Sequence, residues 1–164
     1  MDWPVNRLNC IVIAVCLFIP SIVLAESFSG KVVKVSDGDT ISVMHQGRAQ
    51  RIRLHGIDTP EKGQAFGNRA KKFTSDLVFG RVVTVQVVDT DRYGRIVGEV
   101  ILPDGRSLNR ELVRSGLAWW YRKYSKDKHL GELEEDARSA RKGLWIDPNP
   151  IPPWEFRKKK VENR

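Results

Sequence analysis

Five short segments with the pattern of β-strands constrain the fold more than any other feature of the chain. They span residues 31–35, 40–44, 51–55, 82–88 and 95–102. Alternation of apolar and polar residues, clearest at 51–55, is typical of a strand with one buried face. Between the third and fourth segments, apolar residues recur at helical spacing: Phe66, Ala70, Phe73 and Leu77. Five strands with one helix inserted after the third predict a small closed barrel of the OB type.

Two further helices are expected after the strands. A short one runs from about residue 108 to 114, with Ser107 as a candidate N-cap and Gly116 after its end. A longer one has an apolar face, acids in its first turns and basic residues before Gly143, the charge order that a helix dipole favours. The expected class is α+β, mainly β: a five-stranded OB-type barrel with about three flanking helices over residues 26–146. A Pro-rich and then basic C-terminal tail, 147–164, follows.

The first 25 residues have the layout of a secretory signal peptide. Arg7 precedes an apolar run at 10–19, and residues 23–25 have small or short side chains where a signal peptidase would cleave. We expect cleavage after Ala25, export to a periplasm or beyond the cell, and no stable membrane association afterwards. An uncleaved membrane anchor is the alternative, which the short run and Pro20 disfavour. Both cysteines, Cys10 and Cys16, would be removed.

The chain is strongly basic, with 28 Lys and Arg against 20 Asp and Glu and a formal net charge of +8. A charge of this sign spread along the sequence favours nucleic acid as a partner. Solubility alone is the competing explanation.

Two acidic clusters are the candidate site. Asp37-Gly-Asp-Thr40 lies in the turn between the first two strands, and Asp58-Thr-Pro-Glu61 follows the third. Each alone is typical of a turn. Barrel geometry can bring the ends of adjacent strands together, and converging carboxylates without cysteine or histidine suit a hard cation such as Ca²⁺ or Mg²⁺.

Arginines accompany these acids. Arg53 precedes the second cluster on the same strand, and Asp91-Arg-Tyr-Gly-Arg95 forms a tight turn between the last two strands. The planar guanidinium fork fits phosphate oxygens, which makes arginine the expected residue opposite a metal in phosphoryl chemistry.

Four motifs resemble, in order and spacing, those of the staphylococcal nuclease (thermonuclease) family. They are Val35-Ser-Asp-Gly-Asp-Thr40, Arg53-Leu-His-Gly-Ile-Asp-Thr-Pro-Glu61, Asp91-Arg-Tyr-Gly-Arg95 and Leu112-Val-Arg-Ser-Gly-Leu-Ala118. The resemblance covers about residues 28–145. It implies an OB-type barrel and a Ca²⁺-dependent phosphodiesterase that acts on DNA and RNA and leaves 3′-phosphate ends.

The resemblance also implies a set of ion ligands. The carboxylates of Asp39 and Asp58 would ligate Ca²⁺ directly, and the backbone carbonyl of Thr59 would be a further ligand. Asp37 would support the ion through water.

The same resemblance assigns the chemistry. Glu61 would activate the attacking water, and Arg53 and Arg95 would bind the phosphate and act in catalysis. Tyr93 would make a further phosphate contact.

The aromatic residues after Ala118 depart from the family pattern. The base-side contact could come from Tyr121, our candidate, or from Tyr124. For Trp119 and Trp120 we expect core packing, with base stacking as the alternative. The loop after Glu61 is shorter than in the best-known member. The tail at 152–157 resembles those of bacterial homologues and receives no chemical role.

Three functions are compatible with these patterns. We favour an exported, monomeric endonuclease or exonuclease, because every position that the resemblance implies is intact. A non-catalytic OB-type nucleic-acid-binding protein and a basic domain that binds anionic envelope polymers are the alternatives.

Overall fold

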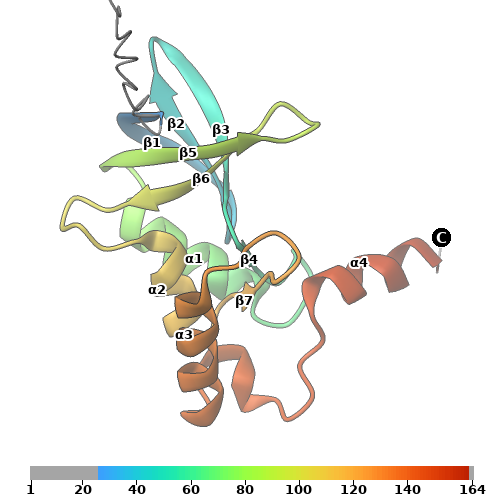
Figure 1. The fold of residues 1–164 in the computed structure, drawn as a ribbon. Helices are drawn as coiled ribbons and strands as arrows, with labels where there is room; N and C mark the ends of the chain where they lie inside the picture. The colour runs from blue at the N-terminus through green and yellow to red at the C-terminus, as the bar shows by residue number, and fades with distance from the viewer. Residues whose placement is uncertain (1–25, 163–164) are drawn as a thin grey trace, which may run out of the picture.

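Five strands close into a barrel in the order β1-β2-β3-β6-β5. They are β1 (Ser27–Asp37), β2 (Thr40–His45), β3 (Arg48–Leu54), β5 (Val82–Thr90) and β6 (Ile96–Ile101). All neighbours are antiparallel except β3 and β6, which pair in parallel and close the barrel. This computed structural model describes residues 26–162, so the predicted signal peptide and both cysteines lie outside the described residues. The predicted barrel is confirmed (Figure 1).

The barrel forms because alternate residues of each strand are apolar. Ile41 of β2 pairs directly with Ile52 of β3, and both side chains are fully buried. Val85 of β5 and Val100 of β6 form an equivalent buried pair. Side chains that alternate between two faces place one apolar set inside and leave the polar set outside.

Three helices gather at one end of the barrel (Figure 1). They are α1 (Gly67–Val78), α2 (Leu108–Arg114) and α3 (Lys128–Ser139). The predicted cap of α2 is present, since Ser107 Oγ accepts a hydrogen bond from the Arg110 backbone N–H at 3.3 Å. Beside these helices, β4 (Ile57–Asp58) pairs antiparallel with β7 (Trp119–Trp120) (Figure 1). None of the helices within residues 26–162 is long and apolar enough to cross a bilayer.

The segment predicted as a Pro-rich and then basic tail contains a helix. After the short 3₁₀ helix η1 (Gly143–Ile146), α4 (Pro153–Glu162) stands apart from the other helices (Figure 1). Its first residue is a proline, which is tolerated where a helix needs no N–H donor. The carbonyl of Pro152 accepts hydrogen bonds from the next turn, at 3.0 Å from the N–H of Phe156.

Trp119 packs as expected rather than facing solvent. Its side chain is 7% exposed and meets the ring of Trp145 edge-on, with centroids 4.4 Å apart. Trp120 is partly buried against the main core. The Trp119 ring therefore joins the β4–β7 pair, in which Trp119 is opposite Asp58, to η1.

Candidate active site

Two buried aspartates, Asp39 in the β1–β2 turn and Asp58 in β4, lie on either side of Arg53. Asp39 is 1% exposed and Asp58 is fully buried. Arg53, on β3, donates a hydrogen bond from one terminal nitrogen to Asp39 Oδ1 and from the other to Asp58 Oδ1, the second at 2.6 Å. Arg53 reaches both because its strand position pairs with Thr40, the residue after Asp39. The structure therefore joins both predicted acidic clusters through one predicted arginine.

Close backbone contact keeps the two turns together. Asp39 Oδ2 accepts a hydrogen bond from the Thr59 backbone N–H at 2.8 Å. A Cβ at Gly38 would lie 2.8 Å from the Thr59 hydroxyl oxygen, so only glycine fits there without displacement. Asp37 accepts a 3.3 Å hydrogen bond from the Asp39 backbone N–H, which shapes the turn from its first residue. The buried acids are thus held by a tightly packed backbone.

Glu61 lies at the edge of this cluster. Its side chain is 39% exposed, so water reaches the carboxylate. Its backbone N–H donates to Gln64 Oε1 at 3.0 Å. A Cβ at Gly67 would lie 2.1 Å from the Glu61 carbonyl oxygen, which shows how closely the loop packs on the start of α1.

Arg157 completes the cluster, and the sequence analysis missed it. From α4 it donates to Asp58 Oδ2 at 2.8 Å, to Asp58 Oδ1 at 3.3 Å and to Glu61 Oε1 at 2.6 Å. Burial lowers the pKa of Arg157, but the two carboxylates outweigh this effect, so its pKa is raised above the usual value. The only signal in the sequence was the Pro-Pro-Trp-Glu-Phe-Arg tail, in which Trp154 and Arg157 are three residues apart on one helix face.

Arg95 and Tyr93 lie in the β5–β6 turn. Arg95 forms an ion pair with Asp91 at 2.7 Å, and its guanidinium lies over the Tyr93 ring, 5.7 Å from the centroid. The Tyr93 side chain is exposed. Within residues 26–162, no hydrogen bond or ion pair joins Arg95 to the buried aspartates. The structure therefore does not bring Arg95 or Tyr93 into direct contact with Asp39 or Asp58.

Tyr121 follows β7 and is covered by the C-terminal helix. Its ring stacks on Trp154, with centroids 5.0 Å apart and planes 9° from parallel. Tyr124 meets the Tyr121 ring edge-on at 4.8 Å and is itself exposed. One face of the Tyr121 ring is therefore taken by the protein, whereas Tyr124 is accessible.

The donor set is compatible in chemistry with a hard cation. Asp39 and Asp58 offer buried carboxylate oxygens that already share one cationic partner, and carboxylates are the oxygen donors that Ca²⁺ takes. The acids Asp39, Asp58 and Glu61 contribute −3, and Arg53 and Arg157 contribute +2, so the cluster keeps a net charge of −1. No group of three or more potential metal-binding side chains was found among residues 26–162.

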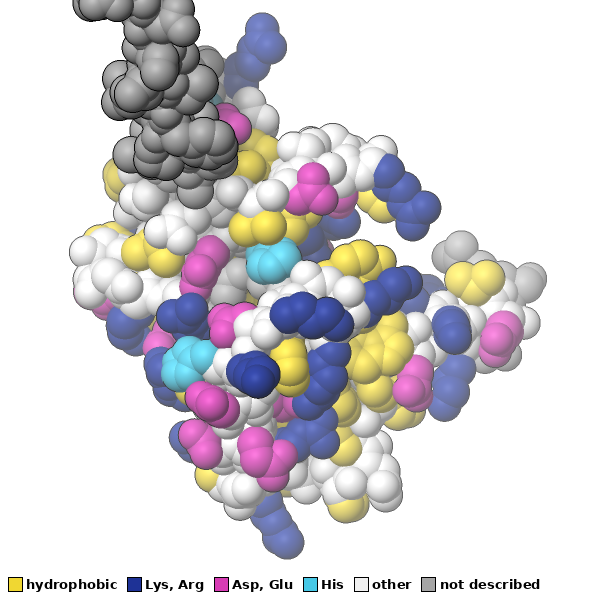
Figure 2. Space-filling model, in the orientation of Figure 1, with side chains coloured by type: hydrophobic (Ala, Val, Ile, Leu, Met, Phe, Trp, Pro, Cys, Tyr) yellow, Lys and Arg dark blue, Asp and Glu magenta, His cyan; other side chains and the backbone are white. Residues whose placement is uncertain are grey.

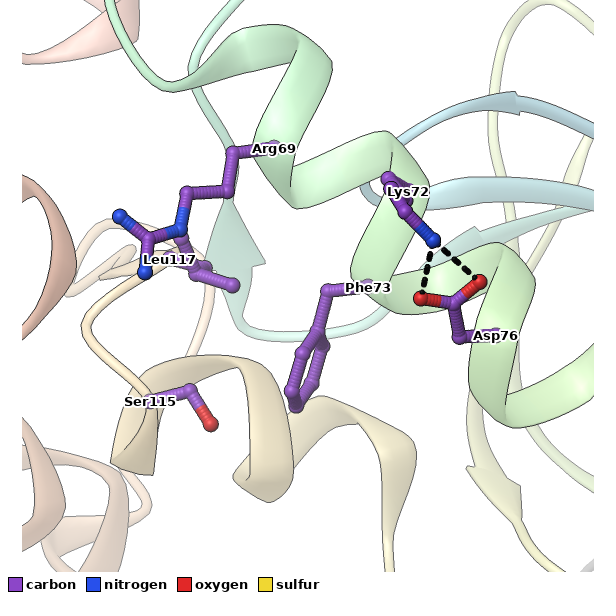
Figure 3. Close-up of a pocket in the computed structure, with 6 residues that line it drawn as sticks. All are labelled: Arg69, Lys72, Phe73, Asp76, Ser115 and Leu117. Atoms are coloured by element: carbon purple, nitrogen blue, oxygen red, sulfur yellow. Dashed lines mark hydrogen bonds and ion pairs between the residues drawn. The ribbon is translucent and has the colours of Figure 1, made fainter.

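Elsewhere in residues 26–162, the surface carries charges of both signs and further cavities. Figure 2 shows basic side chains spread between acidic ones over the visible face rather than gathered in one block. The cavity in Figure 3, about 290 Å³, lies between α1 and the end of α2. None of the predicted site residues lines it: its walls are Arg69, Lys72, Phe73, Asp76, Ser115 and Leu117.

The fold and the cluster together define an OB-barrel protein with acids and arginines suited to phosphodiester chemistry. A family model described as "Staphylococcal nuclease homologue" matches residues 51–147, and the chain belongs to this family. It is 47% identical over 138 residues to an "Uncharacterized endonuclease" of Escherichia coli, covering 84% of this chain and 90% of the relative. It is 42% identical over 157 residues to a "Micrococcal nuclease" of Shigella flexneri, covering 90% of each.

The family extends to plants. The "Staphylococcal-like nuclease CAN1" of Arabidopsis thaliana is 42% identical over 110 residues, which covers 67% of this chain and 34% of that protein. Membership of this family and the nuclease relatives make the chain a nuclease, a hydrolase whose substrates are nucleic acids.

Proposed function

We propose that this nuclease is a Ca²⁺-dependent phosphodiesterase that cleaves DNA and RNA and leaves 3′-phosphate ends. The observation that carries the proposal is the buried pair Asp39 and Asp58, joined by the Arg53 guanidinium, with Glu61 beside them. Two buried carboxylates that share a cationic partner form a site for positive charge, and phosphodiester cleavage needs positive charge next to the phosphate.

The carboxylates of Asp39 and Asp58 and the backbone carbonyl of Thr59 would hold the ion, and Asp37 would support it through water. Thr59 is 3% exposed and its N–H donates to Asp39, so its backbone is held beside that carboxylate. When bound there, Ca²⁺ would supply charge that offsets the phosphate oxygens and polarises a water.

The remaining steps use the chain's own side chains. Glu61, which is accessible to water, would take a proton as the water oxygen attacks phosphorus. Arg53 and Arg95 would bind the non-bridging oxygens, whose negative charge grows in the transition state. Cleavage of the bond to the 5′ oxygen would leave the phosphate on the 3′ side, and the departing oxygen would take a proton from solvent water to give a 5′-hydroxyl strand. Tyr93 would add a phosphate contact and Tyr121 a base-side contact.

We also propose that the protein acts after export, as a monomer in the periplasm or outside the cell. The apolar run and short side chains before Glu26 support this proposal, because they have the order of a cleavable signal peptide.

Metal removal tests the proposed function. Asp39→Ala should abolish nucleotide release and Ca²⁺ binding in a calorimetric titration, because a direct carboxylate ligand is lost. Chelation should have the same effect on the native protein, and Ca²⁺ should restore activity. End-group labelling of the products should show 3′ phosphates.

Asp76→Ala is the matched control, because Asp76 is an exposed aspartate of α1 that pairs with Lys72. It should retain full activity and full Ca²⁺ binding. Full activity of native protein in excess chelator would overturn the metal assignment. Undiminished nucleic-acid binding without hydrolysis under any condition would instead favour a non-catalytic binding protein.

A further inference from the structure

Residues 151–157, which we call the clamp segment, hold the loop that carries Glu61. The Gln64 side chain bridges the two: its Oε1 accepts from the Glu61 backbone N–H at 3.0 Å, and its Nε2 donates to the Ile151 carbonyl at 2.6 Å. Arg157 contacts the Glu61 carboxylate itself. The clamp segment lies outside the matched family region, 51–147, although it contacts two of the predicted site residues.

The position of the Glu61 carboxylate depends on this contact. The Glu61 backbone is fixed by Gln64 and by the close approach of Gly67. Its side chain is 39% exposed, and the ion pair with Arg157 is its side-chain partner among the described residues. A partly exposed glutamate without a partner samples several rotamers, so Arg157 selects one of them.

Arg157 is itself well anchored. It holds both oxygens of the fully buried Asp58. One helical turn earlier, Trp154 stacks on Tyr121 and meets the Trp119 ring edge-on at 5.7 Å. The guanidinium therefore connects a rigid buried carboxylate to one whose rotamer would otherwise be free.

We propose that Arg157 is a positioning residue of the nuclease, which fixes the Glu61 carboxylate relative to Asp58 so that it faces the attacking water. This inference rests on the proposed role of Glu61 as the base. Misplacing a catalytic group by about 1 Å can lower a rate on the order of a hundredfold. Loss of Arg157 should therefore act on turnover through Glu61.

The test is a double-mutant cycle measured at a Ca²⁺ concentration that saturates each variant, as set by direct titration. Arg157→Ala should lower kcat by about ten- to a hundredfold, with the Kd for an uncleavable oligonucleotide changed much less. Arg157→Lys, which keeps one charged donor, should recover part of the loss. In the Glu61→Gln background, Arg157→Ala should cause less than about a twofold further loss, because the group it positions is gone.

Lys158→Ala is the control, since Lys158 is the exposed neighbour of Arg157 on α4 and should leave kcat unchanged. Circular dichroism and thermal unfolding establish that each variant is folded. If Arg157→Ala does not fold, Arg157→Lys takes its place in the cycle. Its partial loss of kcat must then disappear in the Glu61→Gln background.

Three results would overturn the inference. The kcat of Arg157→Ala could be unchanged, or it could be raised, which would show that α4 blocks the site. The third is a decrease in kcat by the same factor with and without the Glu61 carboxylate. Wild-type turnover in Glu61→Gln alone would instead overturn the proposed role of Glu61. The two failures are therefore distinguishable.

Discussion

The guanidinium of Arg53 connects the two buried aspartates to each other. Its side chain is 20% exposed and each of its terminal nitrogens contacts a different carboxylate. Removing one partner of a buried ion pair costs about 3–5 kcal/mol, because a desolvated charge is left behind. Replacing Arg53 would therefore disturb the fold of the site together with any phosphate contact. Arg95 is the better residue for a test of phosphate binding.

Arg95→Ala should lower turnover far more than it weakens binding of an uncleavable substrate analogue. The reason is that a donor aimed at charge that develops in the transition state stabilises that state most. A single such donor contributes about 2–4 kcal/mol, and Arg95→Lys should recover only part of it, since lysine lacks the planar fork. Steady-state kinetics and equilibrium binding measure the two effects separately.

Arg92→Ala is a suitable control, because Arg92 lies in the same turn and contacts Tyr93 but has no proposed phosphate role. Near-normal turnover in a folded Arg95→Ala protein would remove Arg95 from the mechanism.

At the scale of elements, the β5–β6 turn depends on Asp91. One oxygen of this carboxylate accepts from the backbone N–H of Tyr93 at 2.9 Å and of Arg95 at 3.0 Å, and the other accepts from the Arg95 side chain at 2.7 Å. Burial raises the pKa of Asp91, but these hydrogen bonds outweigh it and the pKa lies below its usual value.

The stability contributed by Asp91 should therefore be lost in acid. A carboxyl whose pKa is lowered by folding stabilises the folded state above its unfolded pKa of about 3.9, and the effect disappears as the pH falls through the folded value. Asp91→Asn should lower the free energy of unfolding by up to about 1 kcal/mol above pH 5, as for a partly exposed pair.

Urea unfolding of both proteins between pH 3 and pH 7 measures this difference. The difference should shrink toward zero below about pH 4. A difference that stays constant over the whole range would show that the charge of Asp91 does not hold the turn.

The sequence predicts those elements that have a recognisable pattern within their own residues. The barrel strands have apolar alternation, and α2 has its serine cap. The β4 and β7 strands have two residues each, and only their tertiary pairing defines them. Helix α4 carries four consecutive basic residues, Arg157-Lys-Lys-Lys160, and has no apolar periodicity to detect.

The presence or absence of a local sequence pattern also explains why most site residues were predicted and Arg157 was missed. The acids and Arg53 lie within or beside neighbouring strands, so barrel topology alone suggests that they meet. Arg157 lies 96 positions after Glu61 on a helix whose path no local pattern indicates. Its contact with Asp58 exists only because Trp154 and Ile151 dock their segment on the site.

At the scale of the whole molecule, the charge of +8 should contribute to substrate affinity. Binding of DNA by the Glu61→Gln protein should weaken steeply with salt, with a log–log slope of about −3 or steeper if four or more phosphates are contacted. Fluorescence anisotropy with a labelled oligonucleotide between 50 mM and 300 mM salt measures the slope. A flat dependence would show that the charge serves solubility.

The docking of α4 has a practical consequence for where this protein can be cut or joined. The matched family region stops at residue 147, and the barrel is complete by then, so a border drawn there looks safe for a fusion or a domain exchange. Cutting at residue 147 would remove Trp154 and Arg157, which would leave Asp58 with Arg53 and would take from Glu61 its ion pair with Arg157. A grafted copy of this nuclease should include residues 26–162, and a passenger domain joined on that side needs a spacer that keeps α4 free to dock.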